Sequence, residues 1–163
     1  MRNLRRDKQW TGLIDRLIEE KDPETGQSAF PSLRELMCFA AGLGYEQSRR
    51  EPLGEDWVDF VEGRVFPRSD VALDLLYLIA LAAERRVEVI DEEHEDQAVQ
   101  IFEEYANGGL SVLNNWLNAH APDESPIRSL MTDLRRCGFL KGDESHDGAP
   151  EDVIFAALSK MDG

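Results

Sequence analysis

The feature that most constrains the fold is a run of residues, 71–83, in which Asp74 carries the only charge and Tyr77 the only hydroxyl. Ser69 stands before the run at the position of a helix N-cap, so we predict a helix that begins near residue 70. A helix that is apolar on nearly every side is buried in a protein core or in a membrane. This one is too short for a bilayer, which takes about 20 apolar residues. The run therefore predicts the central helix of a helical fold.

Apolar residues at helical spacing predict further helices on both sides of this run. The clearest start is at Ser32, which forms a capping box with Glu35 before an apolar stripe that ends near Gly44. Four other helices are predicted over residues 4–21, 91–117 and 126–138 and close to 153–161.

Three segments have weaker signals. Residues 45–66 predict a connector with a short helix near its end, since Arg, Pro and Gly interrupt any long period. Residues 85–90 predict an extended segment or a helix end, because no partner strand is evident. Asn107 and the two glycines after it predict either a kink or an antiparallel turn. We expect an all-α fold of six to seven helices around residues 71–83, with residues 1–121 as a helical core domain and 122–163 as a C-terminal helical extension.

The composition limits the possible partners and the compartment. The chain has 33 acidic residues and 18 Lys and Arg, which gives a formal net charge of −15. This charge opposes sequence-independent binding of nucleic acid. The two cysteines, Cys38 and Cys137, lie in helix-like patterns and predict no disulfide framework. No signal peptide and no membrane span is evident. We therefore expect a cytoplasmic protein that does not contact a membrane.

Acidic side chains are concentrated in one stretch of the sequence. Ten carboxylates and no Lys or Arg occur between Val87 and Ile127. A solvated helix face is the favoured interpretation, a docking surface for a basic protein comes second, and a divalent-cation site comes third because adjacent ligands point in different directions around a helix. We expect no metal and no cofactor. The candidate partner-binding residues are Asp91, Glu92, Glu93, Glu95, Asp96, Glu103 and Glu104.

Arginines form the opposite feature, at the N-terminus and in the connector. Arginine suits phosphate or carboxylate recognition, since its guanidinium is a rigid fork of donors. Intramolecular pairing with the excess acids is the favoured interpretation, and contact with phosphate or a partner is the alternative. The candidate residues for anion or nucleic-acid contact are Arg2, Arg5, Arg6, Arg49 and Arg50.

No group of residues predicts catalysis. Neither cysteine nor any serine lies in a strained glycine turn, and no phosphate-binding loop occurs. The three histidines, His94, His120 and His146, fall in unrelated polar contexts, and no carboxylate is set apart by an apolar pocket. We therefore expect no catalytic residues and no enzymatic activity.

Two stretches, AFPSLRELMCFAAGLGYEQSRREPL from Ala29 and IFEEYANGGLSVLNNWL from Ile101, are similar to a family of bacterial proteins. The chain resembles the Dnd system-associated proteins, found beside DNA phosphorothioation genes, over residues 4–120. The resemblance implies a role in marking DNA with sulfur or in restricting invading DNA that lacks the mark. None of the matched residues is a catalytic signature.

Together these features predict a non-enzymatic accessory or regulatory protein of a phosphorothioation-linked modification or restriction system that defends against phage. It would act by contact with protein components of that system, and its contact with DNA would be indirect or weak. One alternative is a DNA-binding module that uses the arginines. Another is an acidic DNA mimic that blocks a DNA-binding partner. No oligomeric state is predicted.

Overall fold

The computed structural model describes residues 1–141. The chain divides into two compact units, Met1–Thr132 and Asp133–Gly163, and helix α5 (Pro126–Arg136) begins in the first and ends in the second. The helix predicted near residues 153–161 lies outside the described residues. All other described helices and strands belong to the first unit. The domain boundary between residues 121 and 122 stays a prediction.

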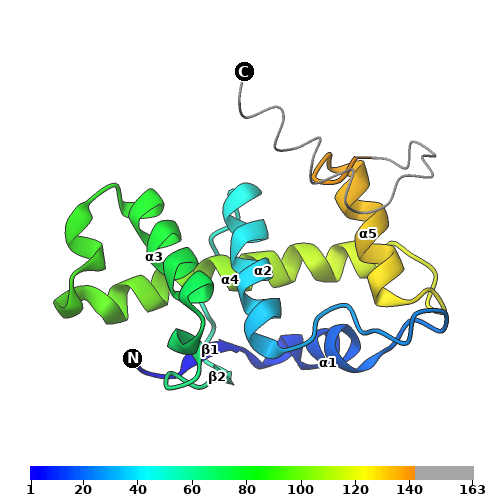
Figure 1. Cartoon of the computed structure of the whole chain (residues 1–163), viewed down its shortest axis with the longest axis horizontal. Coiled ribbons are helices and arrows are strands. Elements are labelled where there is room, and N and C mark those ends of the chain that lie inside the picture. Colours follow the sequence, from blue (N-terminus) through cyan, green and yellow to red (C-terminus); the bar gives the residue numbers. More distant parts are fainter. Residues whose placement is uncertain (142–163) are drawn as a thin grey trace. The chain divides into compact units, whose positions relative to one another are not determined.

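Helix α4 (Glu95–Asn118) is the central element of the first unit (Figure 1). It contacts helix α2 (Leu33–Glu46), helix α3 (Asp70–Glu84) and the first strand. Two acids in its first turn favour its start, because the positive end of a helix dipole attracts negative charge. Its core side chains follow helical spacing and include Phe102, Leu110, Leu113 and Leu117.

The expected interruption of α4 at residues 107–109 is absent, since the helix is continuous through them. The glycines instead allow other backbone segments to approach. A Cβ atom on Gly109 would collide with the Ala40 carbonyl of α2, and one on Gly44 would collide with the Tyr105 carbonyl of α4. Glycine is therefore used at these sites for close helix packing and not for a turn.

Helix α3 is not central, so that prediction is wrong. It buries one face through Ala72, Leu76, Ile79 and Ala80. On the opposite face, Val71 is 79% exposed and Leu78 is 61% exposed. Ser69 does cap this helix, as predicted, and accepts a hydrogen bond from the Ala72 N–H.

Two short strands, β1 (Leu4–Asp7) and β2 (Trp57–Val61), form an antiparallel sheet in which Arg6 faces Val58. The sequence had predicted helices for both segments. The two strands lie far apart in the sequence, so local periodicity does not reveal that they pair, and β1 has only four residues. The first helix, α1 (Thr11–Glu19), consequently starts later than expected, after a 3-10 turn over Lys8–Trp10.

The described residues therefore contain five α-helices and two strands, fewer helices than the six to seven predicted, while the mainly helical class is confirmed. Further 3-10 turns occupy Phe66–Arg68, Val87–Ile90 and Glu92–His94. The Ser32 cap of α2 is confirmed: its hydroxyl accepts a hydrogen bond from the Glu35 N–H. No helix among residues 1–141 has the length and apolar content that crossing a membrane requires.

Candidate functional site

The N-terminal arginines meet an acidic side chain in the interior of the fold. Glu103 of α4 is only 1% exposed and accepts hydrogen bonds from both terminal nitrogens of Arg2, at 2.5 and 2.8 Å. The backbone N–H of Arg5 donates to the same carboxylate at 2.7 Å, and the Arg5 guanidinium lies 3.3 Å away. These hydrogen bonds with Glu103 raise the pKa of Arg2 against the opposing effect of burial. The group fastens β1 to α4.

A second acid of α4 receives the connector arginine. The Nε atom of Arg50 lies 2.6 Å from Glu104, and one of its terminal nitrogens lies 3.3 Å from Glu84 of α3. Gln100 also donates to Glu104, at 2.8 Å. Burial lowers the pKa of Arg50, but the hydrogen bonds and charges of Glu104 and Glu84 outweigh that effect and raise it. Arg50 therefore joins α3, α4 and the connector.

The two other candidate arginines are also engaged within the chain. Arg49 pairs with Glu51 at 2.7 Å. Arg6 donates to the Asp7 carbonyl and to the Thr11 hydroxyl, and its Nε atom is buried without a hydrogen-bond partner among residues 1–141. Burial lowers the pKa of Arg6. The five candidate arginines thus do not form one free basic surface in the described part of the chain.

Most of the other candidate acids lie on the surface of the protein. Asp91, Glu92 and Glu93 are exposed in residues 87–94, the stretch of 3-10 turns that leads into α4 and contains no Lys or Arg, which we call the α3–α4 connection. They make no ion pair with any residue of the range 1–141. Asp96, at the start of α4, is exposed and lies 3.7 Å from Arg2, while Glu95 is half-buried.

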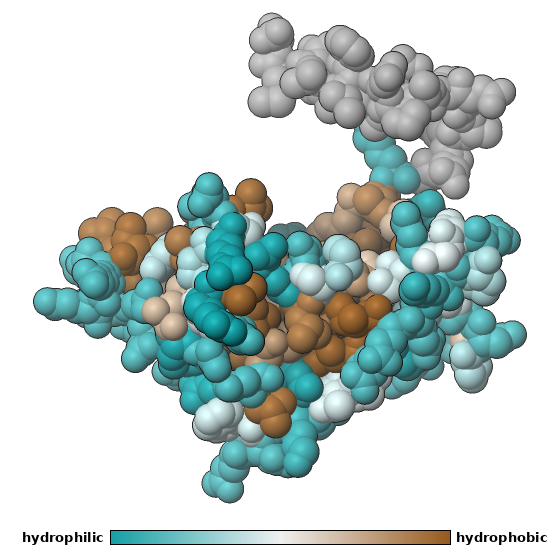
Figure 2. Space-filling view, turned by 60° about the horizontal axis from the view of Figure 1, so that its bottom comes forward, coloured by the Kyte–Doolittle hydropathy of each residue, from teal (hydrophilic) through white to brown (hydrophobic). Residues whose placement is uncertain are grey.

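Apolar side chains accompany these exposed acids. Val87 is 66% exposed and Ile90 is 45% exposed, whereas Val89 between them is buried. The 3-10 turn that carries them packs against both α3 and α4, so the buried valine anchors a turn whose other apolar side chains face outward. Figure 2 shows hydrophobic side chains gathered at the left end of its view, the end where Figure 1 places the α3–α4 connection.

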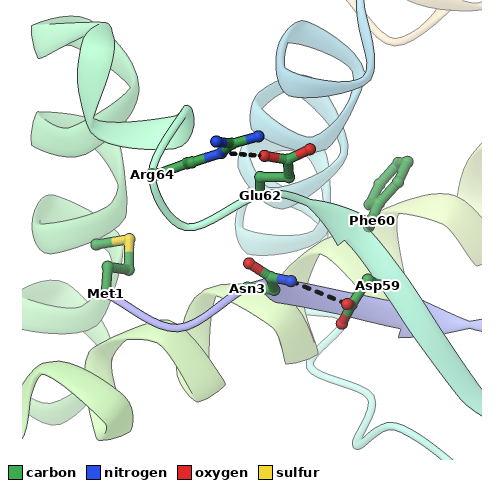
Figure 3. Close-up of a pocket in the computed structure, with 6 residues that line it drawn as sticks. All are labelled: Met1, Asn3, Asp59, Phe60, Glu62 and Arg64. Carbon is green, nitrogen blue, oxygen red and sulfur yellow. Dashed lines mark hydrogen bonds and ion pairs between the residues drawn. The ribbon is translucent and has the colours of Figure 1, made fainter.

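An open pocket of about 600 Å³ lies beside the small sheet (Figure 3). Its polar side chains pair with one another: Asn3 donates to Asp59 at 2.9 Å, and Arg64 donates to Glu62 at 2.5 Å. Phe60 and Met1 complete the lining. Because its charged groups are already satisfied, the pocket does not present an activated nucleophile or an acid–base pair.

Metal-ligating side chains do not converge anywhere in residues 1–141.

A buried polar cluster that the sequence did not reveal joins Asn107 of α4 to the N-terminal segment. Asn107 donates to Asp7 at 3.1 Å and accepts from the indole N–H of Trp10 at 2.7 Å. The Asp7 carboxylate also accepts from the Gly54 N–H at 2.7 Å. With its main polar groups satisfied, this cluster fixes the connector against α4 and is structural.

The structure thus divides the candidate acids into two sets. Glu103 and Glu104 are buried and bind arginines, so they are not accessible to another macromolecule, while Asp91, Glu92, Glu93 and Asp96 are exposed. Glu95 belongs to neither set, since it is half-buried and pairs with the Met1 amino group at 3.2 Å. The sequence had grouped both sets as one docking surface, because charge density along the chain does not distinguish the inward from the outward face of a helix.

Comparison with known proteins identifies the family. Residues 3–144 match the family described as DNA sulphur modification system-associated protein 4. The match extends beyond the predicted limit of residue 120, so α5 belongs to the shared region. No curated protein and no solved structure shows significant similarity to the chain. The chain belongs to the DNA sulphur modification system-associated protein 4 family.

Proposed function

We propose that the chain is a non-enzymatic accessory protein of a DNA sulphur modification system and acts by binding a basic surface on a protein component of that system. The α3–α4 connection is the binding surface. The observation that carries this proposal is the exposure of Val87 and Ile90 beside three exposed acids, Asp91, Glu92 and Glu93, that form no ion pair within residues 1–141. The family supplies the biological context.

The two kinds of side chain have different roles in such a contact. Exposed carboxylates attract a basic partner over a distance and orient it during encounter, which mainly increases the association rate. Apolar side chains lose contact with water in the complex and supply affinity. Exposed Val87 and Ile90 therefore account for binding strength, and the acids account for selection of a basic partner.

The ion pairs that the arginines form within the chain favour protein contact over direct DNA contact. Affinity for DNA depends on cations that neutralise phosphates. Arg2 and Arg50 are already paired with buried acids, and Arg49 is paired with Glu51. Releasing these arginines for phosphate would leave Glu103 and Glu104 buried without a partner, which is costly.

The test is direct binding between the purified chain and each purified protein of the sulphur modification system from the same host. A variant with Asp91→Asn, Glu92→Gln and Glu93→Gln is compared with a control that carries Glu19→Gln, Glu46→Gln and Glu55→Gln. Both remove three negative charges from exposed positions. If each connection acid contributes about 0.5 kcal/mol, the first variant binds about tenfold more weakly.

The control should bind nearly as well as the unmodified chain. Equal weakening by both variants would show that net charge and not this surface matters. Failure of every component to bind would contradict the proposal, as would a mobility shift of DNA with a steep salt dependence.

A further inference from the structure

Helix α3 carries an apolar stripe that the described part of the chain leaves uncovered. Its members Val71, Leu75, Leu78 and Ala82 recur at intervals of four, three and four residues, so they share one face of the helix. Val71 and Leu78 are 79% and 61% exposed, Ala82 is exposed, and Leu75 is half-buried. A helix that is apolar on both faces is typical of one covered on both faces. The fold covers one of them.

Charged residues at the two ends of the stripe have opposite signs. Asp70 and Asp74 lie in its first half, and Arg85 and Arg86 follow the last turn of α3. All four are exposed. Arg86 is 3.8 Å from Glu84, a distance at the long end of an ion pair, and Arg85 has no ion pair among residues 1–141. The face therefore balances two acids with two arginines, unlike the α3–α4 connection acids, which have no such counterpart.

We propose that this stripe is a self-association surface, on which α3 of a second copy packs antiparallel around a two-fold axis near Leu78. Helical residues equally distant from Leu78 then lie opposite one another, and Asp70 of one copy lies near the C-terminal end of the other copy's α3, where Arg85 and Arg86 follow the helix. Asp74 faces Ala82, whose small side chain leaves room for Arg85 to approach the carboxylate. Such self-complementarity is what a two-fold interface requires.

The alternative arrangements fit this face less well. In a parallel pair, like charges would meet at both ends of the stripe, which is unfavourable. A basic partner would meet Arg85 and Arg86 as well as the acids. The antiparallel copy is the occupant that satisfies both ends. The inference does not depend on the proposed function, because it concerns another surface and another partner.

The test uses the full chain alone, measured by light scattering and sedimentation up to about 100 µM, a range suited to an interface at the small end of the usual sizes. We expect a concentration-dependent dimer. Leu78→Asp should abolish it, since the side chain lies at the proposed axis. Leu33→Asp, which alters an exposed leucine at the start of α2, should leave it unchanged. Circular dichroism of each variant checks that the helices remain.

Charge variants test the antiparallel arrangement. A chain with Asp70→Arg and Asp74→Arg should be monomeric, and so should a chain with Arg85→Asp and Arg86→Asp. An equimolar mixture of the two should form a heterodimer, because every opposing pair again has opposite signs. An unmodified chain that stays monomeric throughout the range would overturn the inference. So would a dimer that survives Leu78→Asp, or a mixture that remains monomeric.

Discussion

Replacing Glu103 by Gln tests whether the buried carboxylate holds the N-terminal strand on α4. The substitution keeps the shape of the side chain but removes its charge. It removes the anionic partner that Arg2 and Arg5 share and leaves Arg2 only the longer contact with exposed Asp96. It also places an amide N–H group, which is a hydrogen-bond donor, next to other donors. Three groups that now donate to Glu103 lose a charged acceptor: the two guanidinium groups and the Arg5 N–H.

The magnitude follows from the geometry. Removing one partner of a fully buried ion pair costs about 3–5 kcal/mol. The side chains of Arg2 and Arg5 are 27% and 30% exposed, so part of each guanidinium can regain water when Glu103 is lost. We therefore expect Glu103→Gln to lower the free energy of unfolding by about 2–4 kcal/mol. Such a loss would be a large part of the stability of a small domain.

Equilibrium unfolding in urea measures this loss. With a denaturant dependence of about 2 kcal/mol per molar, the midpoint should fall by about 1–2 M. Glu93→Gln, which removes an exposed acid that has no ion-pair partner in the described part of the chain, should change the free energy of unfolding by less than about 0.5 kcal/mol. The loss caused by Glu103→Gln should persist at about 1 M salt, because buried pairs are screened much less than exposed ones. A loss below about 1 kcal/mol, or one that salt removes, would refute this reasoning.

Three further predictions concern other parts of the first unit. Gly44→Ala should destabilise the protein, because the new Cβ meets the backbone of α4. Gly42→Ala in the same helix meets no atom within 4 Å and should stabilise the protein by about 0.5–1 kcal/mol, measured by thermal unfolding. Destabilisation by both substitutions would contradict the close packing of α2 on α4. Burial raises the pKa of Cys38 to about 11, so its alkylation, followed by peptide mass spectrometry, should accelerate about tenfold per pH unit between pH 8 and 10. A rate that levels off near pH 9 would disagree with that environment. Burial opposes ionisation of Asp22, but hydrogen bonds, above all from Arg128, hold the pKa of Asp22 below the ordinary 3.8. The stability that ionised Asp22 contributes is therefore complete at neutral pH and is lost as the pH falls below 3.8. Asp22→Asn should therefore lower the free energy of unfolding more at pH 7 than at about pH 2, and an equal loss at both would argue against the pairing.

Signals contained in a few neighbouring residues predicted the structure well. The predictions of N-caps at Ser32 and Ser69 are confirmed. Such a cap depends only on a hydroxyl that accepts a hydrogen bond from the N–H three residues later, so it can be read from a short stretch of sequence. Helix α5 begins at Pro126, as the serine before it and the proline predicted. The mainly helical class followed from the same local patterns.

Features that depend on distant residues were missed. Strand β1 is stabilised by pairing with β2 and by the Glu103 ion pairs, neither of which is visible in its own four residues. The use of Gly109 in α4, which leaves room for the backbone of α2, depends on a segment that is distant in the sequence. Hydropathy correctly marked α3 as unusual but could not show that only one of its faces is covered by the fold.

The candidate site shows the same limit. The sequence identified the α3–α4 connection acids but could not separate them from Glu103 and Glu104, which helical geometry turns inward. It also suggested that the arginines would pair internally, and the structure supplies their partners, including Glu103 for Arg2 and Glu104 for Arg50.

We propose that the exposed acids of the α3–α4 connection, and not the buried acids of α4, steer a basic partner protein to this surface. The most direct measurement is the association rate with that partner as a function of salt, by stopped-flow fluorescence, for the unmodified chain and for the variant with Asp91→Asn, Glu92→Gln and Glu93→Gln. Steering predicts that the rate for the unmodified chain falls about tenfold or more as salt increases, and that the variant loses most of this dependence. Identical salt dependence for the two proteins would contradict the claim.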